Sequence, residues 1–294
     1  MFRSAKNKIL CGVGKVAAAS VFGAAAARGA SISSGNSTVT FNPSSSSSGI
    51  PYVSDWVVDG VDQYGGTPAG GETLAVALGN GALMSLSNTN SNETIESSFF
   101  SGNLATVTYL YQGSGYAFTA TVKDILTGGS PGSGVSALTE TVDINNTGSV
   151  GLPITFATFV RPNVNATPTG QTLNLGTNSA SVTDASGTTF NYAVTPTPDL
   201  FSESTNGGTN YYDSAPGIYN GTVGFAYLWG NMDDPTAITL GVGGSEIFSF
   251  SETVSGVSSA PALVPLPTAA KSALATLAGL AVIGVVRRMR RTNV

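Results

Sequence analysis

The sequence predicts an all-β protein whose main domain is an antiparallel β-sandwich. Apolar and polar residues alternate over several short segments, as they do in strands that bury one face. The 37 glycines in 294 residues fit many tight turns between short strands. No segment between residues 50 and 257 has the apolar spacing of an amphipathic helix. A region of roughly 200 residues suits one large sandwich.

Individual strands and turns support this fold class. Within 116–122 every second residue is apolar, whereas Thr119 and Thr121 lie on the opposite face. The link at 112–115 has the length of a hairpin connection, and Asn80-Gly81 is a strong hairpin signal between two apolar runs. Further apolar stripes at 223–229 and 248–250 predict two more strands.

The N-terminal part predicts export. Residues 1–30 combine a basic start with an apolar run at 16–27 and small residues after it, which is typical of a secretory signal peptide. Cys11 would leave with that peptide, so the mature protein would have no cysteine. Residues 31–49 are rich in serine and uncharged, which predicts a flexible leader, with room for one strand at Ser37–Phe41, before the sandwich at 50–257.

The C-terminal part predicts a membrane segment. After a linker and short motif at 258–268, residues 269–286 are apolar except for one lysine, Lys271. As a helix this segment would rise about 27 Å, at about 1.5 Å per residue, which nearly matches a hydrocarbon core of about 30 Å. An arginine cluster in the tail 287–294 would stay cytoplasmic by the positive-inside rule. The cluster consists of Arg287, Arg288, Arg290 and Arg291.

The motif at Val264-Pro265-Leu266-Pro267, followed by the apolar helix and the arginines, resembles the PEP-CTERM sorting tails of bacterial surface proteins, in the variant written VPLPA. The segments 55–63, 139–148 and 224–229 are similar to β-rich ectodomains of uncharacterised PEP-CTERM proteins. The resemblance implies secretion across the inner membrane of a bacterium, processing by an exosortase-type protease, and delivery to the cell surface or an exopolysaccharide matrix. The alternative is an ordinary C-terminal anchor that is kept.

Charge and composition exclude several functions. Between residues 29 and 270 the only basic residues are Lys123 and Arg161, and all 17 acidic residues lie in this region. Such an acidic surface repels phosphate backbones, so nucleic acid is excluded as a partner. The chain has no histidine, which excludes a Ser-His-Asp triad and a histidine-ligated zinc site.

A small group of acids is the one candidate ligand site. Asp55, Asp59 and Asp62 lie close in sequence to Trp56 and Tyr64. Carboxylate oxygens could contribute to a Ca²⁺ site, and an aromatic ring beside them could pack on a sugar. The alternative is a solvent-facing loop with Trp56 in the core. Apart from this Ca²⁺ hypothesis, no metal or cofactor is expected.

Glu140 lies at an apolar position of a predicted strand. It shares the parity of its apolar neighbours, so a regular strand would bury it, which would raise its pKa and suit a general acid. A one-residue bulge would instead move it to solvent. No catalytic residue is assigned.

Taken together, these features predict a secreted, non-enzymatic surface or matrix protein associated with exopolysaccharide. The first alternative is a carbohydrate-binding module, Ca²⁺-dependent or not. The second is a glycoside-active enzyme, which would need two carboxylates facing each other about 5–10 Å apart across a cleft.

If both ends are processed, the mature protein lacks the signal peptide and the tail. We expect the intact mass of the secreted form to exclude residues 1–30 and 268–294. A measured mass that includes 268–294 would contradict processing of the tail.

Overall fold

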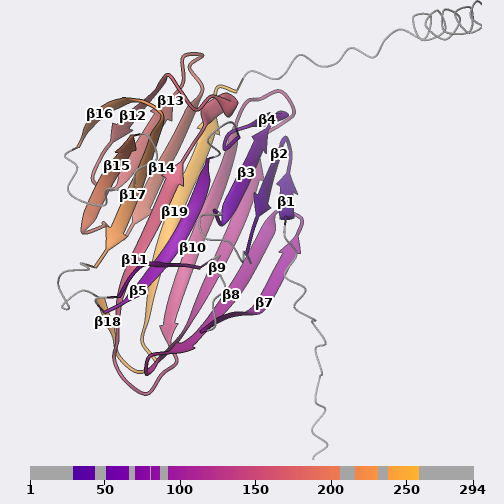
Figure 1. Cartoon of the computed structure of the whole chain (residues 1–294). Coiled ribbons are helices and arrows are strands. Elements are labelled where there is room, and N and C mark those ends of the chain that lie inside the picture. Colours follow the sequence, from indigo (N-terminus) through magenta and orange to yellow (C-terminus); the bar gives the residue numbers. More distant parts are fainter. Residues whose placement is uncertain are drawn as a thin grey trace, which may run out of the picture.

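The computed structural model describes residues 29–43, 51–65, 70–79, 81–86, 92–205, 216–230 and 238–257. Over these residues the chain forms two large antiparallel sheets that pack face to face (Figure 1). The predicted all-β sandwich is therefore confirmed. The helical structure among the described residues is one short 3-10 turn, η1 (Val164–Ala166).

The first sheet, counted over the described residues, has 10 strands. Seven of them form the continuous path β1 (Ala30–Ser34), β2 (Ser37–Phe41), β3 (Val53–Val58), β5 (Gly71–Leu78), β11 (Leu152–Arg161), β17 (Val223–Trp229) and β15 (Leu200–Thr205). The other three pair beside this path: β4 (Val61–Asp62) on β3, β6 (Met84–Ser85) on β5, and β18 (Ile238–Leu240) on β11.

The second sheet has 9 strands over the same described ranges. Their order is β16 (Gly217–Gly221), β12 (Gln171–Leu175), β13 (Ser179–Thr183), β14 (Thr189–Thr195), β19 (Ser245–Ser255), β10 (Ser136–Asn146), β9 (Tyr116–Gly128), β8 (Leu104–Gly113) and β7 (Glu93–Ser101). Strands β7 to β10 are neighbours in both sequence and space, whereas β19 enters the sheet from the far end of the chain between β10 and β14.

Both predicted hairpins occur. Strands β8 and β9 pair up to Gly113 and Tyr116, and the two residues between them have positive φ, 53° at Ser114 and 82° at Gly115. Two central residues with positive φ are the requirement of a type I′ turn, whose twist matches that of the flanking strands. The second hairpin joins β5 to β6, with Val76 opposite Met84, so the link between the paired residues spans 77–83 and is longer than a two-residue turn. Asn80 of the predicted turn lies outside the described residues.

The start of the sandwich differs from the prediction. Residues 31–49 were expected to be a flexible leader with room for one strand at Ser37–Phe41. β2 is that strand, but β1, which begins at Ala30, pairs with it at the edge of the first sheet and was not expected. Val39 of β2 is opposite Trp56 of β3, and both side chains are fully buried. The low charge and high serine content suggested flexibility, but alternate apolar side chains such as Ile32 and Val39 allow these strands to join the core.

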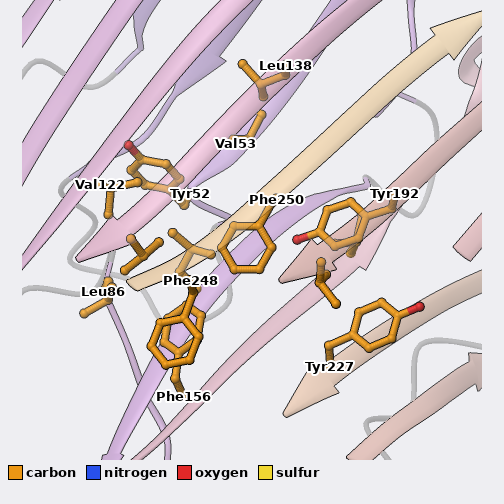
Figure 2. Close-up of a cluster of buried hydrophobic side chains, with 14 of the residues drawn as sticks. Tyr52, Val53, Leu86, Val122, Leu138, Phe156, Tyr192, Tyr227, Phe248 and Phe250 are labelled. Atoms are coloured by element: carbon orange, nitrogen blue, oxygen red, sulfur yellow. The ribbon is translucent and has the colours of Figure 1, made fainter. Parts of the chain in front are cut away.

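The interior is strongly aromatic. Figure 2 shows Phe156 of β11 and Phe248 of β19 meeting between the sheets, with ring centroids 4.4 Å apart and nearly parallel planes. Phe250 and Trp229 extend the same cluster, at 6.1 Å and 5.7 Å from Phe156. Stacked and tilted rings at these separations are favourable aromatic geometries, so this cluster joins the two sheets.

The predicted signal peptide (1–28 of 1–30), the linker and sorting motif (258–268), the apolar helix (269–286) and the arginine tail (287–294) lie outside the described residues. Within the described ranges, no helix has the length and apolar character needed to cross a membrane.

Truncation of the aromatic cluster should destabilise the sandwich. Phe156→Ala removes a fully buried ring and leaves a cavity between the sheets, so we expect a loss of about 3–5 kcal/mol in the free energy of unfolding. Urea denaturation followed by tryptophan fluorescence measures this loss. Phe99→Ala is the control: Phe99 is 54% exposed, so its loss should stay within about 0.5 kcal/mol. Equal losses in both variants would contradict the central role of Phe156.

Candidate functional site

Two features of the sandwich have the chemistry of a site: a group of carboxyl side chains in the interior, and a hollow on the outer face of the second sheet. The interior group consists of Glu72, Asp124, Glu140 and Glu252, none of which has any exposed surface. We call it the carboxyl cluster. Strands β9, β10 and β19 of the second sheet carry three of its members, and β5 of the first sheet carries the fourth.

Strand register brings the cluster together. Asp124 and Glu140 are directly opposite each other on β9 and β10. Glu252 is opposite Leu138 on the other side of β10, which places it diagonally next to Glu140. All three occupy inward positions of regular strands, so Glu140 takes the buried alternative that its parity indicated, and no bulge moves it to solvent.

Hydroxyl groups from both sheets hydrogen-bond to the cluster. Tyr192 and Thr158 donate to Glu72 Oε1 at 2.7 Å and 3.0 Å. Tyr64 donates to Glu252 Oε2 at 2.9 Å. Glu72 and Glu252 lie close enough to shift each other's pKa, so a pair of carboxyl groups from the two sheets meets in the interior.

The second carboxyl pair lies within one sheet. Asp124 and Glu140 shift each other's pKa, and Tyr52 donates to Asp124 Oδ2 at 3.0 Å. Tyr52 and Tyr192, both labelled in Figure 2, lie in the buried layer between the sheets. Burial raises the pKa of both phenols well above its ordinary value, so these hydroxyls keep their protons and act as donors.

Burial also raises the pKa of each carboxyl group in the cluster, because an ionised carboxylate loses its hydration there. The pKa of Asp124 rises to about 7, since Glu140 and the hydrogen bond from Tyr52 offset part of the burial effect. The pKa of Glu140 lies well above its ordinary value because of burial and then the charges of Glu72 and Asp124. Burial and the charge of Glu72 raise the pKa of Glu252 in the same way.

The cluster has the acids of a general acid–base system but no route to a substrate. A general acid or base must come within about 3 Å of the group whose proton it moves. Each of these side chains has zero exposure, and Trp56, Phe190 and Phe250 are buried in the same interior. In this structure the cluster is therefore part of the core and not an open catalytic site.

The hollow lies over β12, β13, β14 and β19 and has a volume of about 380 Å³. Ser179 and Tyr192 line it, together with five further polar side chains: Asn174, Ser181, Asn191, Ser251 and Thr253. These five side chains sit at outward positions of their strands, and small neighbours such as Ala193 and Gly176 keep the floor low. We call this feature the outer hollow.

A cross-strand row forms the outer hollow. Asn174 is opposite Ser181, Ser181 is opposite Asn191, and Asn191 is opposite Thr253. Asn191 Nδ2 donates to Thr253 Oγ1 at 3.3 Å. Amides and hydroxyls can both donate and accept hydrogen bonds. The row therefore suits a neutral ligand with many hydroxyl groups, and it holds no carboxylate or basic group.

The three predicted aspartates take separate structural roles. Asp59 accepts hydrogen bonds from Gly132 N at 2.6 Å, Gly134 N at 2.7 Å and Asn36 Nδ2 at 2.8 Å, so it ties the turn after β3 to the loop between β9 and β10. Burial raises the pKa of Asp59, but these three bonds lower it more, and the net shift is downward.

The other two aspartates flank the same turn. Asp62 accepts a hydrogen bond from Tyr64 N at 2.9 Å, and burial raises its pKa. Asp55 on β3 accepts one from Ser54 Oγ at 3.1 Å. Trp56 is fully buried, so its ring does not offer a face to a sugar. Within the described ranges, no group of three or more His, Cys, Asp or Glu side chains is placed to hold a metal ion.

Sequence reasoning missed the outer hollow. Its residues are Asn, Ser and Thr at alternate positions, which reads as the exposed face of ordinary strands. The missing information was which strands are neighbours, because Asn191 and Thr253 are 62 positions apart.

Neither a protein-family model nor a curated protein matches the sequence. Several solved structures do match the fold. A putative aldose 1-epimerase from Escherichia coli K12 aligns with a TM-score of 0.52 and 13% identity, over 78% of this chain and 99% of that chain. A galactose mutarotase related enzyme from Lactobacillus acidophilus aligns with a TM-score of 0.51 and 9% identity, over 78% and 98%. A bacterial glucoamylase in complex with acarbose aligns with a TM-score of 0.51 and 6% identity, over 79% of this chain and 32% of that chain.

At these identities the likeness establishes the fold alone. The fold is that of carbohydrate-active enzymes, two of which match over nearly their whole length. The prediction that this protein is not an enzyme is contradicted by that likeness. It rested on the lack of histidine, cysteine and recognisable motifs, which excludes particular mechanisms but does not exclude an enzyme fold.

Proposed function

We propose that this protein is a carbohydrate-active protein that binds a neutral saccharide in the outer hollow. The observation that carries the proposal is the cross-strand row of amide and hydroxyl side chains in an open hollow of about 380 Å³. Such a volume lies at the small end of the range for ligand sites, about 300–1,000 Å³. The likeness to an aldose 1-epimerase, a mutarotase-related enzyme and a glucoamylase supports a sugar as the ligand.

Charge supports a neutral sugar over an acidic one. The region between residues 29 and 270 holds 17 acidic residues and two basic ones, Lys123 and Arg161. A surface of one sign repels ligands of the same sign over a Debye length of about 8–10 Å. Uronic acids and phosphorylated sugars are therefore disfavoured relative to neutral saccharides.

We also propose where the saccharide is met. The signal-peptide pattern of 1–30, the motif Val264–Pro267 and the arginine cluster after 286 support export across the inner membrane and recognition by an exosortase-type protease. A protein delivered in this way would reach the cell surface or the extracellular matrix, where exopolysaccharide is the abundant carbohydrate.

A glycan array probed with the full-length chain tests the proposed ligand class, with and without a Ca²⁺ chelator. We expect binding to neutral glycans and none to uronic-acid glycans. Loss of binding in the chelator arm alone would show that binding depends on Ca²⁺. Absence of binding in both arms would contradict the proposal.

Two variants on one strand test the outer hollow as the place of binding. Ser251→Trp fills the hollow from β19 and should weaken binding at least tenfold. Ser249→Trp is the matched control, because Ser249 faces outward two positions earlier and does not line the hollow. Asn191→Ala removes one hydrogen-bonding side chain, worth about 0.5–1.5 kcal/mol, and should weaken binding roughly two- to tenfold. Equal effects of the two tryptophans would place the ligand elsewhere.

The same proteins should be assayed for chemistry on sugars. Two of the matching structures are described as an aldose 1-epimerase and a mutarotase-related enzyme, so polarimetry of freshly dissolved galactose is the first assay. Faster interconversion of its anomers, lost in Ser251→Trp but kept in Ser249→Trp, would assign a reaction to the outer hollow. Binding without faster interconversion would exclude interconversion of galactose anomers as the reaction of the outer hollow.

A further inference from the structure

The carboxyl cluster has no basic side chain to neutralise it. Lys123 is the neighbour of Asp124 on β9 but points to the exposed outer face, and Arg161 ends β11 on the parity opposite to Thr158. The groups that face the cluster are neutral hydroxyls and one indole, contributed by every surrounding element. They are Tyr52, Trp56, Tyr64, Tyr109, Ser136, Thr158 and Tyr192.

We propose that the sandwich interior is a proton-binding site, in which Glu252 and Glu140 each hold a proton and donate it to Glu72 and Asp124. In each pair two fully buried carboxyl groups are neighbours, and their inner oxygens have no other hydrogen-bond partner. The two groups can be hydrogen-bonded to each other only when one of them is protonated, because an ionised carboxylate is an acceptor alone. The native protein therefore carries at least two protons that the unfolded chain releases at neutral pH.

The oxygen atoms themselves require these protons. With all four groups ionised, five buried oxygens would lack a hydrogen-bond partner: Glu72 Oε2, Asp124 Oδ1, Glu140 Oε1 and Oε2, and Glu252 Oε1. Buried charges without partners are among the most unfavourable arrangements in a protein. One proton in each pair removes one negative charge and turns two opposed acceptors into a donor and an acceptor.

The two pairs act on different contacts. Asp124 and Glu140 link neighbouring strands, so their shared proton strengthens one sheet. Glu72 and Glu252 come from opposite sheets, so loss of their proton places two negative charges against each other across the sandwich. Deprotonation of this pair therefore weakens the packing of one sheet on the other, and the two pairs stabilise the fold most in acidic surroundings.

The sign of the pH dependence follows from the raised pKa values. In the unfolded chain these carboxyl groups titrate near pH 4, whereas burial holds the folded pKa of Asp124 near about 7 and those of Glu140 and Glu252 well above their ordinary values. The stabilisation by the cluster is then complete below about pH 4 and is lost as pH rises through the folded pKa values. Burial also raises the pKa of Glu93 to about 8, so loss of its proton adds to this decrease in stability near neutral pH.

Equilibrium unfolding of the full-length chain in urea between pH 5 and 8 tests the proposal. Each proton held by the folded state alone makes the folding equilibrium constant fall about tenfold per pH unit. The two cluster protons give a fall of about a hundredfold per unit, and Asp124 and Glu93, whose pKa values are about 7 and about 8, steepen it at lower pH. Glu140→Gln combined with Glu252→Gln supplies amide donors that cannot ionise, so this double variant should lose about a hundredfold per unit of the slope and exceed the original protein in stability at pH 8.

The control double variant removes two carboxyl groups outside the carboxyl cluster. Glu96→Gln combined with Glu246→Gln changes one exposed and one partly exposed acid and should keep the full slope. A slope in the Glu140/Glu252 variant equal to that of the control would overturn the proposal. Infrared spectroscopy gives a second measurement that needs no variant: the folded protein at pH 7 should show the C=O stretch of protonated carboxyl groups, and the unfolded chain should not. Absence of that band in the folded protein would also overturn it.

Discussion

Four carboxyl groups buried without a basic partner are the constraint on which the interior of this sandwich depends. Packed sheets lie about 10 Å apart, so Glu72 and Glu252 meet in the middle of the core and must be hydrogen-bonded there. Tyr64 and Tyr192 donate those bonds while their rings take part in the aromatic cluster. The polar network and the apolar packing are thus carried by the same side chains, and neither could be rearranged without the other.

The interior and the outer hollow are two faces of the same strands. On β19, Glu252 points inward and its neighbours Ser251 and Thr253 point outward; on β14, Tyr192 points inward and Asn191 outward. Side chains alternate between the faces of a strand, so a shift of register by one residue would exchange them. The packing of Glu252 against Glu72 therefore also fixes the row of polar groups that the proposed saccharide would meet.

The absence of histidine and of cysteine from the sandwich does not exclude an enzyme fold. Composition excludes mechanisms that need histidine or cysteine, but carboxyl and hydroxyl chemistry stays open, and a fold is defined by strand order and packing. The comparison with solved structures concerns strand order and packing alone, at 6–13% identity. It could therefore relate the chain to carbohydrate-active enzymes although no motif in the sequence does so.

The sequence by itself determined the features that depend on neighbouring residues. Alternation predicted the strand at 116–122 and the inward direction of Glu140, and a short glycine-containing link predicted the turn at Ser114-Gly115. Prediction from the sequence failed for β1, because membership of a sheet depends on a partner strand more than on local composition. Only the tertiary structure decided that Tyr64 reaches Glu252, 188 positions away, and that Asn191 and Thr253 form one row. Periodicity is a local property of a strand, whereas its neighbours are chosen by the packing of distant segments.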